Sequence, residues 1–217
     1  MDVNQLVQTI AIFALPVILA ITLHEAAHGY VARHFGDLTA YAQGRVSLNP
    51  LRHIDLVGTI VVPLLILLVS RGVFLFGWAK PVPVNYSALH NPKRHMAWVA
   101  AAGPAANLAM SLAWAALLKL ALVLPLNAIT APMSAMARAG ILINLVLMFL
   151  NLLPILPLDG GRILASLLPG RASWQYAKLE PWGLPLLLLL LVTHVLDSVL
   201  GPLVNAGVSV IHAVVML

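Results

Sequence analysis

Long apolar stretches recur along this chain of 217 residues, and they limit what it can fold into. Residues 5–32 form the first, which as a helix is long enough to span about 30 Å of hydrocarbon. Three further stretches are of similar character: 96–124, 136–156 and 183–200. A last one, 203–217, follows the helix-breaking pair Gly201-Pro202. We therefore predict an all-α polytopic membrane protein with about four to six transmembrane helices.

Composition supports lipid as the solvent of this chain. Only 9% of the residues are charged, against about 25% in soluble domains, so water-facing surface cannot be covered. The formal net charge of +5 comes from basic residues scattered among apolar runs, which indicates membrane topology and not nucleic-acid binding. The chain has no cysteine, so a transition metal would have to be held by histidine and carboxylate.

Two segments are predicted to reach the membrane without crossing it. Residues 56–77 begin with an apolar run that contains Pro63 and is too short to cross, so we expect a re-entrant segment. With this topology, nine of the twelve Lys and Arg residues lie inside and two outside, in line with the positive-inside rule. Residues 37–55 are polar with alternating character, which predicts a short strand or hairpin, an interfacial β element.

The first apolar stretch contains the sequence HEAAH, in which His24, Glu25 and His28 lie within one helical turn. Residues i and i+4 share a face of a helix, so both imidazoles can bind one ion, and zinc suits them. Glu25 would then act as the general base that takes a proton from water. The alternative is that both histidines are hydrogen-bonded packing residues, but an ionisable cluster inside a span is costly without a function.

Catalytic zinc usually takes three protein ligands, and Asp159 is the candidate for the third. It lies in NLLPILPLDGGRI, where Pro154 and Pro157 break a membrane helix and the glycine pair at 160–161 permits unusual backbone angles. At membrane depth a broken helix is tolerated only where it lies against protein or lines a water-filled cavity. We therefore expect water to reach the Asp159 carboxylate. Two alternatives stay open: Asp159 caps the following helix, or His53 is the third ligand.

Three motifs in order resemble the site-2 protease family of intramembrane zinc metalloproteases. They are HEAAH in the first span, GPAAN at 103–107 in the second, and NLLPILPLDGG at the end of the third. The segments NPLRHID and FGWAKPVPVN resemble the compact bacterial and archaeal branch of that family, which lacks PDZ and CBS domains. The resemblance covers roughly residues 10–170.

This resemblance implies one zinc ion per chain, held by His24, His28 and Asp159, with Glu25 as the base. Asn151, eight residues before Asp159, would hydrogen-bond the oxyanion or the substrate backbone. An uncharged amide with two N–H donors suits that task, although it could instead bond a backbone carbonyl freed near the prolines. Gly103 and Asn107 would help to pack the second span against the site.

The expected function is that of an endopeptidase that cuts transmembrane helices of other membrane proteins. We expect residues 1–217 to form a single membrane-embedded metalloprotease domain, with a catalytic core at about 5–170 and C-terminal helices at about 180–217. It would lie in the cell membrane as a multi-pass protein, with its active site toward the cytoplasmic side. Its partners would be the lipid bilayer and a substrate with a transmembrane helix, whereas the oligomeric state stays open. The alternative function is metal binding or transport by the same His/Asp cluster.

Overall fold

The structure is a computed structural model, and it describes residues 3–62, 65 and 80–216. In chain order the elements are α1 (Val3–His34), α2 (Thr39–Ala42), η1 (Pro50–Arg52), η2 (Leu56–Val61), η3 (Tyr86–Ala88), α4 (Pro92–Val123), α5 (Thr130–Asn151), α6 (Asp159–Leu167), α7 (Gly170–Ala177), α8 (Glu180–Val192) and α9 (Val195–Val215). Elements η1 and η3 are single 3₁₀ turns, and η2 is a π-helix. Within the described ranges the chain forms no strand, so the predicted all-helical class is confirmed for them.

Four helices are long and apolar enough to cross a membrane: α1, α4, α5 and α9. The first three agree with the spans predicted at 5–32, 96–124 and 136–156. The third ends earlier than predicted, at Asn151, because the chain turns three residues ahead of Pro154.

The predicted fourth span at 183–200 is wrong. The chain breaks at His194, which adopts a left-handed conformation with φ 58°, and this break separates the short apolar helix α8 from α9. Helix α9 then continues through Gly201 and Pro202, which the sequence analysis assigned as the break. A proline inside a membrane helix removes one N–H, and that loss is tolerated where neighbouring groups re-satisfy the carbonyl.

The two predicted interfacial features have different outcomes. The re-entrant segment falls mostly on residues 66–79, which lie outside the described residues. The strand or hairpin at 37–55 is not confirmed, because those residues, all described, form α2, η1 and turns. The reason is visible in the hydrogen bonds: the Arg45 guanidinium donates to the carbonyls of Arg52, Lys80 and Pro81, where a ladder would need backbone N–H groups.

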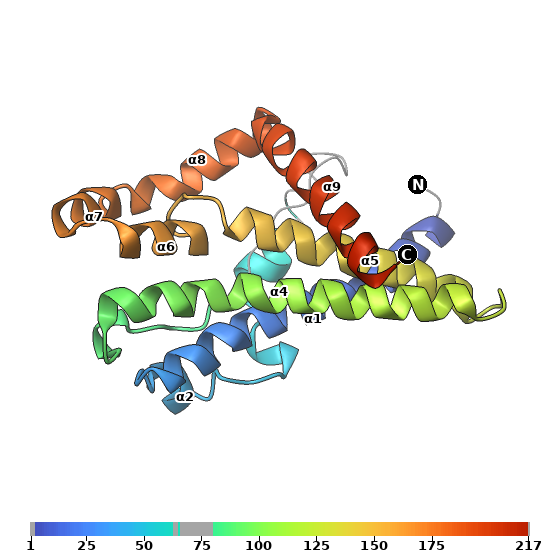
Figure 1. The fold of residues 1–217 in the computed structure, drawn as a ribbon, viewed down its shortest axis with the longest axis horizontal. Coiled ribbons are helices and arrows are strands. Elements are labelled where there is room, and N and C mark those ends of the chain that lie inside the picture. Colours follow the sequence, from blue (N-terminus) through green and yellow to red (C-terminus); the bar gives the residue numbers. More distant parts are fainter. Residues whose placement is uncertain (1–2, 63–64, 66–79, 217) are drawn as a thin grey trace.

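Helix α4 lies at the centre of the bundle and contacts α1, α5, α6 and α9 (Figure 1). The main apolar core fills the space between α4, α5 and α9. Its larger side chains include Met110, Trp114, Leu118, Ile141, Leu145, Val204 and Ile211. Gly140 of α5 lets the indole of Trp114 lie directly against its backbone, since a Cβ there would overlap the ring.

Helices α6 and α7 lie at the same end of the bundle as the start of α4 (Figure 1). Lys93, in the first turn of α4, donates a hydrogen bond of 2.5 Å to the carbonyl oxygen of Leu168 at the end of α6. This bond joins the two helices. The last turn of α1 and the short helix α2 lie at this end as well. This arrangement brings the second half of α1 next to the beginning of α6.

Candidate metal and catalytic site

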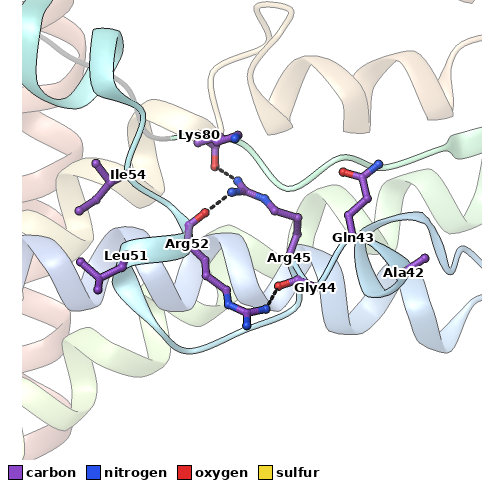
Figure 2. Close-up of a pocket in the computed structure, with 8 residues that line it drawn as sticks. All are labelled: Ala42, Gln43, Gly44, Arg45, Leu51, Arg52, Ile54 and Lys80. Carbon is purple, nitrogen blue, oxygen red and sulfur yellow. Dashed lines mark hydrogen bonds between the residues drawn. The ribbon is translucent and has the colours of Figure 1, made fainter.

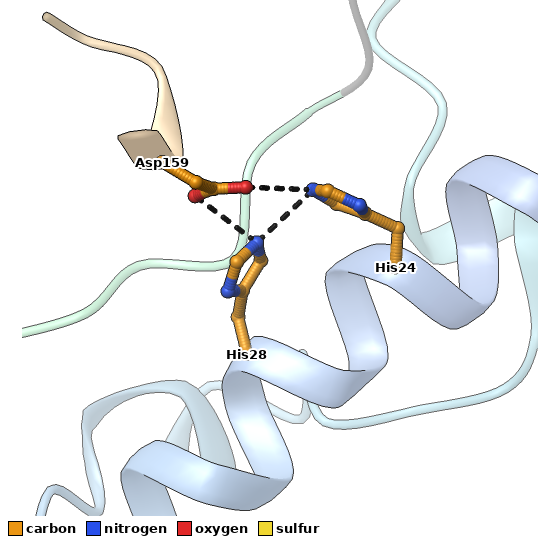
Figure 3. Close-up of side chains that lie close together, drawn as sticks. All are labelled: His24, His28 and Asp159. Atoms are coloured by element: carbon orange, nitrogen blue, oxygen red, sulfur yellow. Dashed lines mark hydrogen bonds and ion pairs between the residues drawn. The ribbon is translucent and has the colours of Figure 1, made fainter. Parts of the chain in front are cut away.

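The two histidines of the HEAAH motif lie one turn apart on α1 and point to the same side of it (Figure 3). Their Nε2 atoms are 3.1 Å apart, and the rings meet edge to face. Both His24 and His28 are buried, although they belong to a helix of membrane length. The helix therefore brings this pair together as the sequence predicts.

Asp159 approaches the histidines as the first residue of α6. Its carboxylate oxygens lie 3.3 Å from His24 Nε2 and 3.4 Å from His28 Nε2. No side chain caps α6, so the predicted alternative of a capping aspartate is wrong.

Close packing of the preceding turn fixes the position of Asp159. Gly160 and Gly161 are helical residues of α6, so the unusual backbone angles predicted for them are absent. They are needed for a different reason: a Cβ on Gly160 would lie 2.5 Å from the carbonyl oxygen of Leu153, and one on Gly161 2.6 Å from the carbonyl carbon of Ile155. Helix α6 can therefore begin directly against the turn only because both residues lack a side chain.

The hydrogen bonds at the far side of each ring fix the tautomers of both histidines. His28 Nδ1 lies 2.7 Å from the carbonyl oxygen of Val99, which can only accept, so Nδ1 carries the proton. For His24 the assignment follows a chain of amides that starts at the carbonyl of Gly140. Asn144 donates to this carbonyl, so its oxygen accepts from Asn107, whose oxygen is then turned toward His24 Nδ1 at 2.5 Å.

In their neutral forms both imidazoles direct an unprotonated Nε2 toward the same point. The Asp159 carboxylate is directed there too, and its Oδ2 is buried without a hydrogen-bond donor. Three atoms that each direct a lone pair to the same point repel one another unless a cation lies between them. These are the residues that could hold a metal ion, with all donor atoms within 4.8 Å of one another.

The spacing and chemistry of these three donors suit zinc. Ligands bound at about 2.0–2.1 Å to a tetrahedral ion lie about 3.3 Å from each other. The three donor separations here are 3.1, 3.3 and 3.4 Å. Two imidazoles and one carboxylate also match a common ligand set of catalytic zinc, which leaves one position of the tetrahedron for water or substrate.

Asn144 is a residue that the sequence analysis missed. It and Asn107 are fully buried, each 0% exposed, and together they hold the Nδ1 side of His24. Partners of this kind orient a metal ligand and increase its basicity. The signal that could have found Asn144 is a single amide inside the apolar run ILINLVLMF, where a polar group needs a partner.

Glu25 is half-buried beside the three donors and is held by the segment that precedes η3. The backbone N–H of Val82 donates 2.8 Å to Glu25 Oε2. The same segment is fixed at its far end, where Asp37 accepts from the N–H of Asn85 at 2.7 Å and from that of Thr39 at 2.9 Å. The Asp37 side chain is buried, and each of its two oxygens accepts from one of these backbones.

Two other candidates are not brought into the cluster. His53 is buried, but its Nε2 bonds the carbonyl oxygen of Ser47 at 2.8 Å, so it is not among the converging donors. Asn151, at the end of α5, donates 2.9 Å to the carbonyl of Leu147 in its own helix. This bond uses one of its two N–H groups, and the proposed contact of the other with a substrate stays a prediction.

The fold and the site together define a multi-pass membrane protein with a buried cluster of two histidines and one aspartate that could hold a metal ion. Comparison with known proteins gives the family. Residues 126–193 match the model of peptidase family M50. The chain is 39% identical over 198 residues to the "Putative zinc metalloprotease YwhC" of Bacillus subtilis, covering 88% of this chain and 84% of that protein.

A second relative is more distant. The "Putative zinc metalloprotease Rip2" of Mycolicibacterium smegmatis is 30% identical over 184 residues, covering 83% of this chain and 66% of that protein. No solved structure matches the chain significantly. The chain belongs to peptidase family M50, the site-2 protease family, as the three motifs predict.

Proposed function

We propose that this protein is an intramembrane zinc endopeptidase, which hydrolyses peptide bonds in transmembrane segments of other membrane proteins. The observation that supports this most strongly is the convergence of three metal-ligating side chains, His24, His28 and Asp159, with a glutamate one residue after the first of them. A packing cluster would pair its polar groups as donor and acceptor, whereas Asp159 Oδ2 is buried here without a hydrogen-bond partner.

Each residue has a role that its position supports. Zinc, when held by the three donors, polarises a carbonyl and activates water. Glu25 takes the proton of the attacking water and passes it to the amine of the leaving chain. The Val82 N–H orients this carboxylate through Oε2 and leaves Oε1 to work as the base. Asn151 supplies an N–H donor to the oxyanion that develops on the scissile carbonyl.

The substrate must be unwound at the site, because a helical backbone hides its carbonyls. We propose that the segment 80–85 binds it in extended form. Pro81 and Pro83 restrict their neighbours to extended angles, and Asn85 has such angles, with φ −95° and ψ 93°. Addition of a strand to such a segment is a common way to bind a peptide.

The proposed orientation places the site toward the cytoplasmic side of the cell membrane. The end of the bundle that holds α6, α7 and the start of α4 also holds five basic residues: Lys93, Arg94, Arg162, Arg171 and Lys178. Cytoplasmic ends of membrane proteins are enriched in such residues.

A cleavage assay with one conservative variant tests the proposal. The purified protein, reconstituted in liposomes, is given zinc and a panel of single-span substrates, and Glu25→Gln is compared with wild type. We expect wild type to cleave at least one substrate and Glu25→Gln to be inactive while it keeps its zinc, because an amide cannot accept the proton. Glu180→Gln is the matched control, since Glu180 is the other glutamate of the chain and pairs with Arg162 at the surface.

Cleavage by Glu25→Gln at the wild-type rate would contradict the proposed mechanism. If zinc crosses the liposome membrane equally fast with wild type and with Glu25→Gln, and neither cleaves a substrate, the protein is instead a transporter that uses the same cluster.

A further inference from the structure

A cavity of about 620 Å³ lies away from the metal donors, between the end of α2, the loop that follows it, η1 and Lys80 (Figure 2). Three of the residues that line it are cationic, namely Arg45, Arg52 and Lys80, and none is acidic. Among the described residues no ion pair involves any of the three. The cavity therefore concentrates positive charge that no acidic side chain in the described ranges neutralises.

The two arginines are held in place by neutral partners. Arg45 donates to the carbonyls of Arg52, Lys80 and Pro81, and Arg52 donates to the carbonyl of Gly44 (Figure 2). Backbone carbonyls orient a guanidinium but do not cancel its charge. Gly44 is part of this arrangement, since its φ of +62° would strain a residue with a side chain. The site is therefore preorganised for an anion.

Apolar side chains surround the cations on the exposed side. Leu51 and Ile54 line the cavity, and Leu56 follows them along the chain. Leu51 is 73% exposed and Leu56 is 69% exposed. Bulky apolar groups exposed beside fixed cations are favourable where acyl chains and headgroup phosphates meet.

The level of the cavity along α1 agrees with a position among the lipid headgroups. Val46 directly follows Arg45, and Val82 comes two residues after Lys80. Both valines lie against Gly29 of α1, one turn after Glu25. This is the inner half of a helix of membrane length, close to Arg33 in its last turn. Phosphate groups of the inner leaflet lie at this level when the basic end of the bundle is cytoplasmic.

We propose that this cavity binds the phosphate of an anionic phospholipid headgroup, with Arg45, Arg52 and Lys80 around the phosphate and the acyl chains over Leu51 and Leu56. The site is separate from the proposed catalysis, but it shares one element with it. Arg45 holds the carbonyls of Lys80 and Pro81, directly before the Val82 N–H that bonds Glu25.

The test measures how much phosphatidylglycerol the intact, delipidated protein retains, compared with phosphatidylcholine, by native mass spectrometry. Lys80→Gln removes one cation whose amine makes no hydrogen bond within the described part of the chain, so the fold is left intact. We expect wild type to prefer phosphatidylglycerol and Lys80→Gln to bind it about fivefold more weakly, as for the loss of one cation at an anionic surface. Lys80→Glu should weaken it further.

Arg138→Gln is the matched control, because it removes one positive charge from α5, outside the cavity, and should bind phosphatidylglycerol as wild type does. Equal retention of the two lipids by wild type, or equal losses in Arg138→Gln and Lys80→Gln, would overturn the proposal. Displacement of the lipid by an equal concentration of inorganic phosphate would overturn it in favour of a soluble anion, and displacement by an acidic peptide in favour of a protein partner. Retained melting temperatures of the variants separate these outcomes from misfolding.

Discussion

Gly103 of α4 lies directly against both imidazoles of the proposed metal site. A Cβ built on it would lie 2.5 Å from His24 Cε1 and 2.6 Å from His24 Nε2, and it would overlap His28 Nε2. Ordinary contacts to carbon begin near 3.4 Å. The substitution Gly103→Ala therefore forces the rings and α4 apart by roughly 1 Å.

The rings cannot move without loss, because α4 also holds their far sides. Val99 and Asn107, which accept from His28 and His24, lie four residues before and after Gly103, on the same face of α4. A shift of about 1 Å lengthens both hydrogen bonds beyond their normal range. Loss of one such partner typically lowers metal affinity by about 10–100-fold. We expect Gly103→Ala to bind zinc at least about a hundredfold more weakly than wild type.

The assay is competition for zinc between the purified protein in detergent and a chromophoric chelator, with the melting temperature measured on the same preparation. Overpacking costs about 1–3 kcal/mol of stability, and alanine returns about 1 kcal/mol through its higher helix propensity. The variant should therefore stay folded while it loses zinc. Gly201→Ala in α9 is the matched control, because a Cβ there meets nothing within 4 Å, and it should keep wild-type affinity. Wild-type zinc affinity in folded Gly103→Ala would refute this account of the packing.

Three further predictions follow from the same geometry. Asn144→Leu should weaken zinc binding by about tenfold in the same competition assay, because Asn107 could then turn its donor toward His24; unchanged binding would remove Asn144 from the site. Asn151→Ala should keep its zinc and cleave about a hundredfold more slowly, and Asn151→Asp should be slower still; a normal rate in a zinc-replete variant would show that this amide only bonds Leu147. Single cysteines at positions 47 and 87 should be labelled from the same, cytoplasmic side, in a chain with no native cysteine; opposite labelling would show that 56–77 crosses the membrane.

The sequence predicts the chemical part of the site well, because it depends on local spacing. HEAAH sets two imidazoles on one face of any helix that contains it, and the prolines at 154 and 157 mark the end of the helix before Asp159. Three spans could be found because apolar length alone defines them. Hydrogen-bond partners that lie many residues away connect these local features, as Asn107 does for His24. The local spacing of residues in the sequence does not reveal such partners.

The errors have physical causes. Pro202 was predicted to end a helix, yet it lies inside α9, as Pro16 and Pro104 lie inside α1 and α4. Surrounding helices can satisfy the carbonyl that each proline frees, so proline is a weak signal in lipid. The burial of Asp37 has no local signal in the sequence, because one of its two partners, Asn85, lies 48 residues away.

Zinc bound by these three side chains is the central claim, and X-ray absorption at the zinc edge, with metal analysis on the same sample, tests it most directly. The account predicts about one zinc per chain, with nitrogen and oxygen ligands at about 2.0–2.1 Å, two of them imidazole. It also predicts that Asp159→Ala loses most of the zinc. Stoichiometric zinc with unchanged coordination in Asp159→Ala, or a purified wild-type protein that binds no zinc when it is supplied, would contradict it.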